Sequence, residues 1–571
     1  MSLAPVSAHW RVLIVGVAIA VPAVASAQDP EQGTERFFFD QPEKKSERET
    51  TLLRGSIVST SFYYRETAAA GAPYNAGDAA PLTASPFDRL FSDLRLQMTA
   101  QHISGGDWDF RGDVRGRYNT GGTRLSDNTA TSPYEGQDVP VQSGTFSGNE
   151  LDIREFYVTK AGLSTDFHVG RQYALELAGT KFDGLGIKHR KNEHITYLVF
   201  AGAYPTRGSR DIREDYPRAA QEDEDAGPGK RIMPAVGGGG LAYRYDRYHG
   251  AIGGVAILPL ADDLARFQGT GTQEKPRVFA TANGYYRRST RLDLFHFAVL
   301  DVASADGAGL RNLTVGANYQ PDPALRLFVD VTRVDAETLN IQAQTKLDNP
   351  DPTQTVAVQN NIEVLRIASE SARAGVSSAF KRNRYQLSVF GTLRRRPEII
   401  LQPRGLMLDP NSALPPTVLQ EQRAADITVR AVDRQLLEKY RVGVTGSRTF
   451  PIGDANVART KVLLVHADVS TEMMDGKAEL EGNVSFVDAE DDRRGDTCAN
   501  LTDLTSCFGT ANARTYGIGG LAFYRFKPEW FFIGSLNLGY QVLTAANAAG
   551  APEEQPAILS ATAFARIAYR F

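Results

Sequence analysis

The sequence is poor in three residue types and carries no excess of positive charge. Its 571 residues include only two cysteines, three tryptophans and six methionines, and 63 Lys and Arg stand against 67 Asp and Glu. The missing basic excess excludes a typical nucleic-acid binder, because such proteins neutralise phosphates with Lys and Arg. The mean hydropathy is −0.30, and beyond the N-terminus no apolar run reaches the roughly 18 residues that a membrane-spanning helix needs. A bundle of membrane helices is therefore excluded as well.

The one long apolar run lies at the N-terminus. Arg11 precedes an apolar stretch that begins at Val12 and closes on Ala25-Ser26-Ala27. A basic residue, an apolar core and a small-residue site in this order are typical of a secretory signal peptide, and we expect cleavage before Gln28. The alternative, an N-terminal membrane anchor, would need a longer apolar core. The mature protein is expected to work outside the cytoplasm.

The two cysteines fit that compartment. Cys498 and Cys507 lie nine positions apart in a polar stretch, far from a third cysteine or a histidine cluster that could complete a metal site. We expect a loop disulfide, which would contribute about 2.5–3 kcal/mol by the chain-entropy estimate. Two unpaired thiols are the alternative.

The body of the chain alternates between apolar and polar residues with a period of two. Between Trp108 and Tyr118, aromatic, apolar and glycine residues occupy one face while Asp and Arg occupy the other. Similar runs of 9 to 12 residues recur along the sequence, longer than most soluble strands and close to the length of a tilted strand that crosses a bilayer. The counts of 28 phenylalanines, 22 tyrosines and 52 glycines favour the same β architecture, and aromatic residues gather at strand ends. The pattern predicts an all-β protein, a single transmembrane antiparallel β-barrel with long extracellular loops.

Turns give the number of strands. Ten short connections alternate with mostly longer ones, which predicts 22 strands with both termini in the periplasm, in a working range of 18 to 22. The least regular stretches are 425–434 and 172–189. The expected organisation is a signal peptide at 1–27, a periplasmic N-terminal segment at 28–50 and the barrel at 51–571. The short turns begin at Ser104, Leu163, Arg190, Asp246, Arg288, Gln320, Arg382, Gln435, Met473 and Lys527.

The last strand ends on Phe571, with Tyr569 two residues before it. This ending resembles the C-terminal signal by which the assembly machinery recognises outer-membrane barrels of Gram-negative bacteria. The resemblance implies residence in that membrane, with the barrel assembly machinery, outer-membrane lipid and lipopolysaccharide as partners.

The interior of so large a barrel cannot be filled by side chains alone. The segment before the first strand is too short for a plug domain, so we expect inward-folded loops to gate the lumen, with 396–424 and 336–369 as candidates. Many arginines fall on the inward register, and an arginine-lined wall favours anions. The alternative is that they pair with inward acids such as Asp93, Asp109, Asp113, Asp152 and Asp330. The arginines are Arg95, Arg111, Arg115, Arg117, Arg154, Arg326, Arg373, Arg394, Arg566 and Arg570.

Residues 150–190 resemble the alginate-export family of outer-membrane barrels. Three pieces carry the resemblance: Glu150-Leu-Asp-Ile-Arg-Glu-Phe-Tyr-Val, Phe167-His-Val-Gly-Arg-Gln and Phe182-Asp-Gly-Leu-Gly-Ile. The resemblance implies a barrel of about 18 strands whose basic lumen passes an acidic exopolysaccharide outward. The residues it nominates for the lumen are Arg154, Arg171, Gln172 and Asp183.

The sequence thus supports three functional hypotheses. The first is an outer-membrane channel for an exopolysaccharide, with an arginine-rich lumen, loop gating and periplasmic polysaccharide-export components as partners. The second is a general or substrate-selective diffusion porin for small solutes, and the third is a closed surface or adhesion barrel. We expect no enzyme, no cofactor, no metal and no nucleic-acid partner: there is no Gly-x-Ser-x-Gly motif, and His189 and His194 flank a turn without a third ligand. The glycines at 237–240 are expected to form a flexible loop end.

Overall fold

The computed structural model describes the greater part of the chain after residue 50. The predicted signal peptide, the N-terminal segment and both cysteines lie outside the described residues, so these three predictions stay predictions. The described residues are 51–66, 87–122, 149–205, 212, 215–216, 233–258, 276–289, 291–304, 308–343, 361–401, 417–419, 421–437, 439–453, 460–491, 512–546, 552–554 and 557–571.

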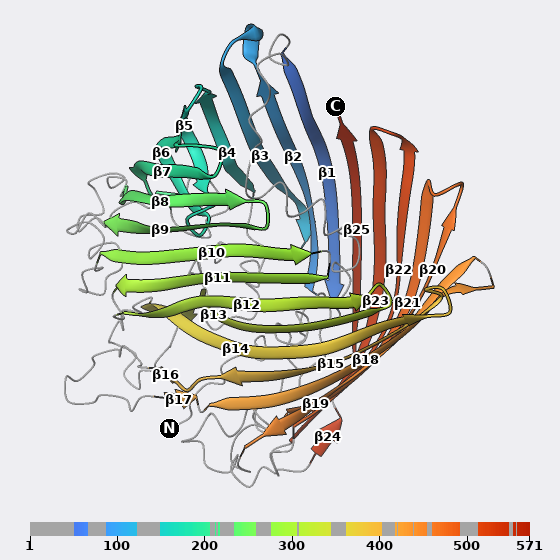
Figure 1. Ribbon diagram of the computed structural model, residues 1–571. Helices are drawn as coiled ribbons and strands as arrows, with labels where there is room; N and C mark the ends of the chain where they lie inside the picture. The colour runs from blue at the N-terminus through green and yellow to red at the C-terminus, as the bar shows by residue number, and fades with distance from the viewer. Residues whose placement is uncertain are drawn as a thin grey trace, which may run out of the picture.

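A single antiparallel sheet of 22 long strands closes on itself and forms a barrel (Figure 1). Its strands are β1 Leu52–Glu66, β2 Phe87–Gln101, β3 Trp108–Gly122, β4 Glu150–Lys160, β5 Thr165–Ala174, β6 Thr180–Arg190, β7 Ile195–Ala203, β8 Ala235–Tyr245, β9 Tyr248–Leu258, β10 Arg277–Ser289, β11 Leu292–Ala303, β12 Gly309–Asp322, β13 Leu325–Ala343, β14 Asn361–Phe380, β15 Tyr385–Arg396, β18 Gln422–Leu436, β19 Tyr440–Ile452, β20 Thr460–Met473, β21 Ala478–Asp491, β22 Asn512–Lys527, β23 Trp530–Ala546 and β25 Ile558–Arg570.

Three short strands lie outside the ring. β24 (Pro552–Glu554) pairs with the end of β23, whereas β16 (Ile399–Leu401) and β17 (Thr417–Leu419) pair with each other. The one helical element among the described residues is a 3-10 turn, η2, at Ile103–Gly105. None of the helices in that part of the chain is long and apolar enough to span a membrane.

The first and last strands close the ring. Ile57 of β1 lies opposite Tyr569 of β25. Gly55 and Phe571 exchange two backbone hydrogen bonds, of 2.9 and 3.1 Å. A side chain at Gly55 would place its Cβ 2.5 Å from the Phe571 ring, so the C-terminal aromatic residue needs a glycine beneath it. Closure removes the unpaired edges that an open sheet of this size would expose.

The two faces of the strands differ in chemistry. In β3, Trp108 and Tyr118 are exposed while Asp113 and Arg117 are buried on the opposite face, which confirms the alternation expected from the sequence. Large apolar side chains are exposed in the same way around the ring, for example Ile518 at 60%. A water-soluble protein rarely exposes so much apolar surface, whereas a barrel in a lipid bilayer is expected to do so. The apolar face is therefore the outer one, and the polar face lines the interior.

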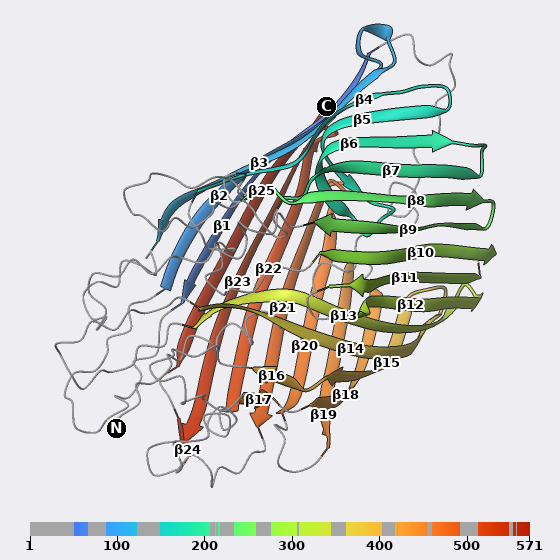
Figure 2. The same ribbon diagram turned by 90° about the vertical axis from the view of Figure 1, so that its left-hand side faces the viewer.

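The ten predicted short turns all join consecutive strands, and they gather at one end of the barrel. We call this the turn end; the opposite end, where the longer connections lie, is the loop end (Figure 2). By the rule for outer-membrane barrels the turn end faces the periplasm. The strand number of 22 is the upper limit of the expected range, not the 18 that the family resemblance implied.

Two local predictions were wrong. Both ends of the expected loop at 336–369 are strand, because β13 continues to Ala343 and β14 begins at Asn361; residues 344–360 lie outside the described residues. The two strands pair with each other along this extension, and this pairing satisfies their backbone groups even where the sequence is polar. The glycines at 237–240 are also not a loop end: they lie within β8, paired with β7 on one side and β9 on the other.

Candidate functional site in the barrel interior

The tip of the β5–β6 hairpin leaves the wall and folds into the barrel. The left-handed φ of +127° at Gly170 breaks the regular course of β5, and the turn itself passes through Ala178 and Gly179 with φ of 58° and 63°. In both views the tip crosses the neighbouring strands (Figures 1 and 2). The Asn283 side chain of β10 donates a hydrogen bond of 2.9 Å to the Glu176 carbonyl, so the tip reaches across β7, β8 and β9.

Glycines make room for this tip. Leu177 has no exposed surface, and a Cβ at Gly240 or Gly253 would lie 2.8 or 2.5 Å from its Cδ2 atom. A side chain at either position would collide with the tip, which explains why β8 and β9 are rich in glycine despite its cost in a strand. Leu177 belongs to an apolar cluster, whose other buried members are Phe182, Phe200, Val236, Val255, Phe279 and Val299.

An ion pair adds to this packing. The Lys188 ammonium of β6 lies 2.8 Å from the Glu176 carboxylate at the tip. Burial alone would raise the pKa of Glu176, but the charge and the hydrogen bond of Lys188 more than offset it, so that the pKa lies below its usual value. Glu176 is therefore ionised at neutral pH and holds the tip to β6.

Arg171 binds the hairpin to the rest of the wall. Its guanidinium donates to Asp183 at 2.5 and 2.6 Å, to the Ile153 carbonyl of β4 at 3.1 Å, and to Asp215. Asp215 belongs to the long connection between β7 and β8 and is only 2% exposed. Lys181 lies 3.7 Å from the same carboxylate. One arginine thus joins four segments of the chain.

The same connection adds two further contacts. The Tyr216 hydroxyl donates to Asp183 at 2.6 Å, and the Ile212 amide donates to the Leu151 carbonyl at 2.8 Å. Burial and the bond to Asp183 raise the pKa of the Tyr216 phenol, so it stays protonated and remains a donor. Asp215 and Tyr216 were not found by sequence reasoning, because nothing in a long polar connection marks the two residues that fold back.

Gln172, the fourth residue nominated by the family resemblance, lies on the other side of β5. Its side chain donates to the His168 carbonyl at 3.4 Å and lies against Gly186, where a Cβ would be 3.2 Å from its Oε1 atom. The strand register places Arg171 opposite Asp183, on the face of the hairpin that carries the exposed Val169 and Leu185 and is turned away from the lumen. The prediction that these two residues line the lumen therefore has no support from the register, and Gln172 lies on the opposite, inner face.

A strip of alternating charge covers the inner face of β2, β3 and β4. A register shift after Asp113 places both Arg154 and Glu155 near this strip. Each arginine in it has a carboxylate partner, as the second interpretation of the sequence expected, and Glu150 and Glu155 join the acids named there. The pairs are Arg95–Asp113 at 2.5 Å, Arg117–Asp93 at 2.7 Å, Arg111–Glu155 at 2.7 Å, Arg154–Asp152 at 3.1 Å, and Arg115 with Glu150 at 3.4 Å and Asp152 at 3.6 Å.

The other arginines of the inward register have varied partners. Arg373 pairs with Asp330 at 2.9 Å and Arg394 with Asp426 at 2.5 Å. Arg566 and Arg570 lie over the rings of Phe564 and Phe531, whereas Arg326 donates to the neutral Asn318 amide at 2.9 Å. Asp109 accepts a hydrogen bond from the His102 amide.

The loop end carries its own charge cluster. Arg395 lies 3.0 Å from Glu421 and 3.1 Å from Glu370. Hydrogen bonds from Arg395 and Arg423 lower the pKa of Glu421 to about 2. Arg395 lies just before the connection 396–424 and Glu421 and Arg423 lie at its end, so the cluster joins the two ends of this connection. Within it, β16 and β17 form a small hairpin.

Aromatic rings gather on the barrel near the turn end. Trp530 lies 4.7 Å from Tyr569 and 5.9 Å from Phe526, and Tyr569 lies 6.0 Å from Phe571, as measured between ring centroids. Such rings are typical of the boundary between membrane and water. They also place the expected assembly signal, Tyr569 and Phe571, within this belt.

A closed antiparallel barrel with an apolar outer face, an aromatic belt and a charged interior defines the class of outer-membrane β-barrels, and this chain resides in the outer membrane. Solved structures of the class show a remote similarity. OccAB3 of Acinetobacter baumannii is 12% identical, with 91% of this chain and 99% of that chain covered and a TM-score of 0.37. OccD3 (OpdP) of Pseudomonas aeruginosa is 9% identical, with 94% and 97% covered and a TM-score of 0.33.

A structure described as a bacterial polysaccharide outer membrane secretin is 11% identical, with 66% and 98% covered and a TM-score of 0.29. No family model and no curated protein matches the chain, so the alginate-export resemblance of residues 150–190 gains no support from a family match. The function of this chain therefore rests on its own residues.

Proposed function

We propose that this outer-membrane barrel is a diffusion channel for small hydrophilic solutes. The observation that carries the proposal is the β5–β6 tip seated inside a ring of 22 strands. A ring of this size encloses more space than its own side chains fill. A segment that folds inward and is held by Leu177 and Glu176 narrows such a space, which favours small solutes.

The pairing of charge in the lumen favours this function over export of an acidic polysaccharide. A row of arginines without acids would favour a long polyanion, whereas Arg95, Arg115 and Arg117 each share the wall with a carboxylate. Paired charges give a wet, nearly neutral wall, which suits solutes that pass one at a time. Exopolysaccharide export and a closed surface barrel are the rival functions.

Reconstitution in planar bilayers tests the channel itself. We expect stepwise conductance increases and a permeability ratio of potassium to chloride near one. Arg115→Gln leaves Glu150 and Asp152 less compensated and should make the pore more cation-selective, while Asp152→Asn should shift the reversal potential in the opposite sense. Purified protein that inserts without producing conductance would favour the closed barrel.

Gene deletion separates uptake from export. If the proposal is right, a deletion strain secretes the same amount of exopolysaccharide, and liposomes that contain the protein swell in small sugars but not in large oligosaccharides. Loss of secretion on deletion, restored by the intact gene, would instead establish export.

A further inference from the structure

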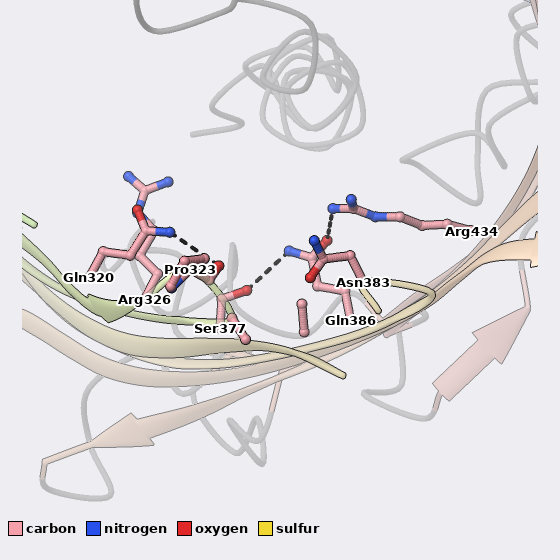
Figure 3. Close-up of a pocket in the computed structure, with 9 residues that line it drawn as sticks. Gln320, Pro323, Arg326, Ser377, Asn383, Gln386 and Arg434 are labelled. Atoms are coloured by element: carbon pink, nitrogen blue, oxygen red, sulfur yellow. Dashed lines mark hydrogen bonds between the residues drawn. The ribbon is translucent and has the colours of Figure 1, made fainter. Parts of the chain in front are cut away.

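A recess opens on the inner wall at the turn end, away from the β5–β6 tip (Figure 3). It has a volume of about 180 Å³ and lies between β12, β13, β14, β15 and β18. Arg326 and Gln386 alternate with Leu327 and Leu387, which are exposed on the outer face, so the recess faces the lumen. Its polar lining consists of Arg326, Arg434, Gln320, Ser377, Asn383 and Gln386.

Among the residues that the structure describes, no carboxylate lines this recess. Arg434 donates to the Gln386 side chain at 2.8 Å and Arg326 to the Asn318 side chain at 2.9 Å, and both acceptors are neutral amides. The carboxylates next to the recess in sequence act elsewhere: Asp433 pairs with Arg384, and Asp322 caps the turn amide of Ala324. Within the described residues, the arginines of the β2–β4 strip differ in that each has a carboxylate within 3.6 Å.

The positive charges of Arg326 and Arg434 are therefore not neutralised by these amides, and further N–H donors of both guanidiniums are available to a ligand. A guanidinium has five N–H donors, of which a single bond to an amide uses one. The pair lies at opposite sides of the recess, and Arg434 extends toward its centre from β18 (Figure 3). Between them, the Gln386 side chain donates a hydrogen bond of 3.0 Å to the Ser377 hydroxyl, which fixes the orientation of both polar groups in the recess. Two guanidiniums at opposite sides of a recess of about 180 Å³ suit a small ligand with two anionic groups.

We propose that the recess is a binding site for small dicarboxylates, placed at the periplasmic exit of the channel. Each terminal carboxylate pairs with one guanidinium, and the amides and hydroxyl between them bind the polar middle of the ligand. This inference rests on the proposed function and gives it a substrate class. The nearly neutral wall admits small ions and solutes of either charge, and the exit recess binds dicarboxylates on their way to the periplasmic side.

Succinate is the probe, and succinamide is its uncharged analogue. Binding to the detergent-solubilised full-length protein is measured by calorimetry, and current block is measured in planar bilayers. We expect saturable binding of succinate, weaker binding of the monocarboxylate propionate and none of succinamide. Arg326→Gln and Arg434→Gln should each weaken succinate binding by about tenfold or more, since each removes a charge-assisted contact, and the double variant should abolish it.

Arg384→Gln is the matched control. It removes one positive charge at the same end of the barrel, but from a side chain that pairs with Asp433 outside the recess, so it should leave succinate binding within about twofold, a difference of about 0.4 kcal/mol. Resistance to unfolding in hot detergent checks that all variants form the barrel. Unchanged succinate binding in the double variant, or equal binding of succinamide, would overturn the site. Because calorimetry needs no ion flow, a protein that conducts nothing but binds succinate would refute the channel and keep the site.

Discussion

Leu177→Ala should release the β5–β6 tip from the wall. The leucine is fully buried over Gly240 and Gly253, and truncation of a buried leucine to alanine costs at least about 2.7 kcal/mol, since the loss of apolar contact is not repaired by collapse of the site. The hydrogen bond from Asn283 to the Glu176 carbonyl is left as the main remaining contact with β10. By the relation between free energy and equilibrium constant, about 2.7 kcal/mol raises the undocked fraction about 80-fold.

Single-channel recording reads this change directly. The undocked tip widens the lumen, so the variant should show frequent excursions to a higher conductance, or a permanently higher level, at the same applied voltage. Liposome swelling should extend to larger sugars. The barrel itself should remain, because the 22 strands keep their backbone pairing.

A leucine on the outer face provides the control. Leu258 of β9 is 50% exposed to the membrane side, so Leu258→Ala makes the same chemical change on a neighbouring strand without touching the tip. It should leave conductance unaltered. If Leu177→Ala gives the same conductance histogram as the wild type while its barrel stays intact, the tip does not narrow the pore and our reasoning on the constriction fails.

Three further predictions concern other contacts. Arg171→Gln leaves the buried Asp215 without its main partner and should cost about 3–5 kcal/mol locally, seen as a lower unfolding temperature in detergent. The depressed pKa of Glu176 means that its contact with Lys188 is complete above the ordinary carboxyl pKa of about 4.3 and is lost as pH falls through the lower folded value. In Lys188→Met, burial is no longer offset and the pKa of Glu176 rises, so that protonation favours the docked tip. The high-conductance excursions should therefore be frequent at neutral pH and become rarer as the pH falls, whereas a pH response identical to the wild type would contradict this. Phe571→Ala should reduce the amount of assembled barrel in the outer membrane without lowering synthesis, measured by heat-modifiable gel migration.

The strand pattern was predictable because it is local. The alternation from Trp108 to Tyr118 and turns such as the one at Asp246 depend on neighbouring residues, and they gave the ten turns and 22 strands correctly. The failures come from pairing with the neighbouring strands, which the local pattern does not show. The glycines at 237–240 look like a loop in isolation, yet hydrogen bonds from β7 and β9 make them strand. The strand extension beyond 336 has the same cause.

The candidate site was only partly predictable. The sequence named Arg171 and Asp183 for the lumen, whereas the fold turns them toward Asp215, which comes from a connection more than forty residues away from Arg171. Leu177 lies in a turn without any motif, and only the fold shows its burial. The sequence also identified Arg326, but Arg434 and the recess between them became visible only in the structure. The alternation of residues along a strand shows which side chains face inward. It does not show with which acid each arginine pairs.

By itself, the sequence determined a membrane barrel, since a period of two over strands long enough to cross a bilayer has one stable solution in lipid. Tertiary structure decided what occupies the interior. Folding places side chains from several strands and connections next to one another. Only the folded barrel therefore shows that arginines on β2–β4 are neutralised, that glycines on β8 and β9 make room for the β5–β6 tip, and that two arginines at the turn end are left for a ligand.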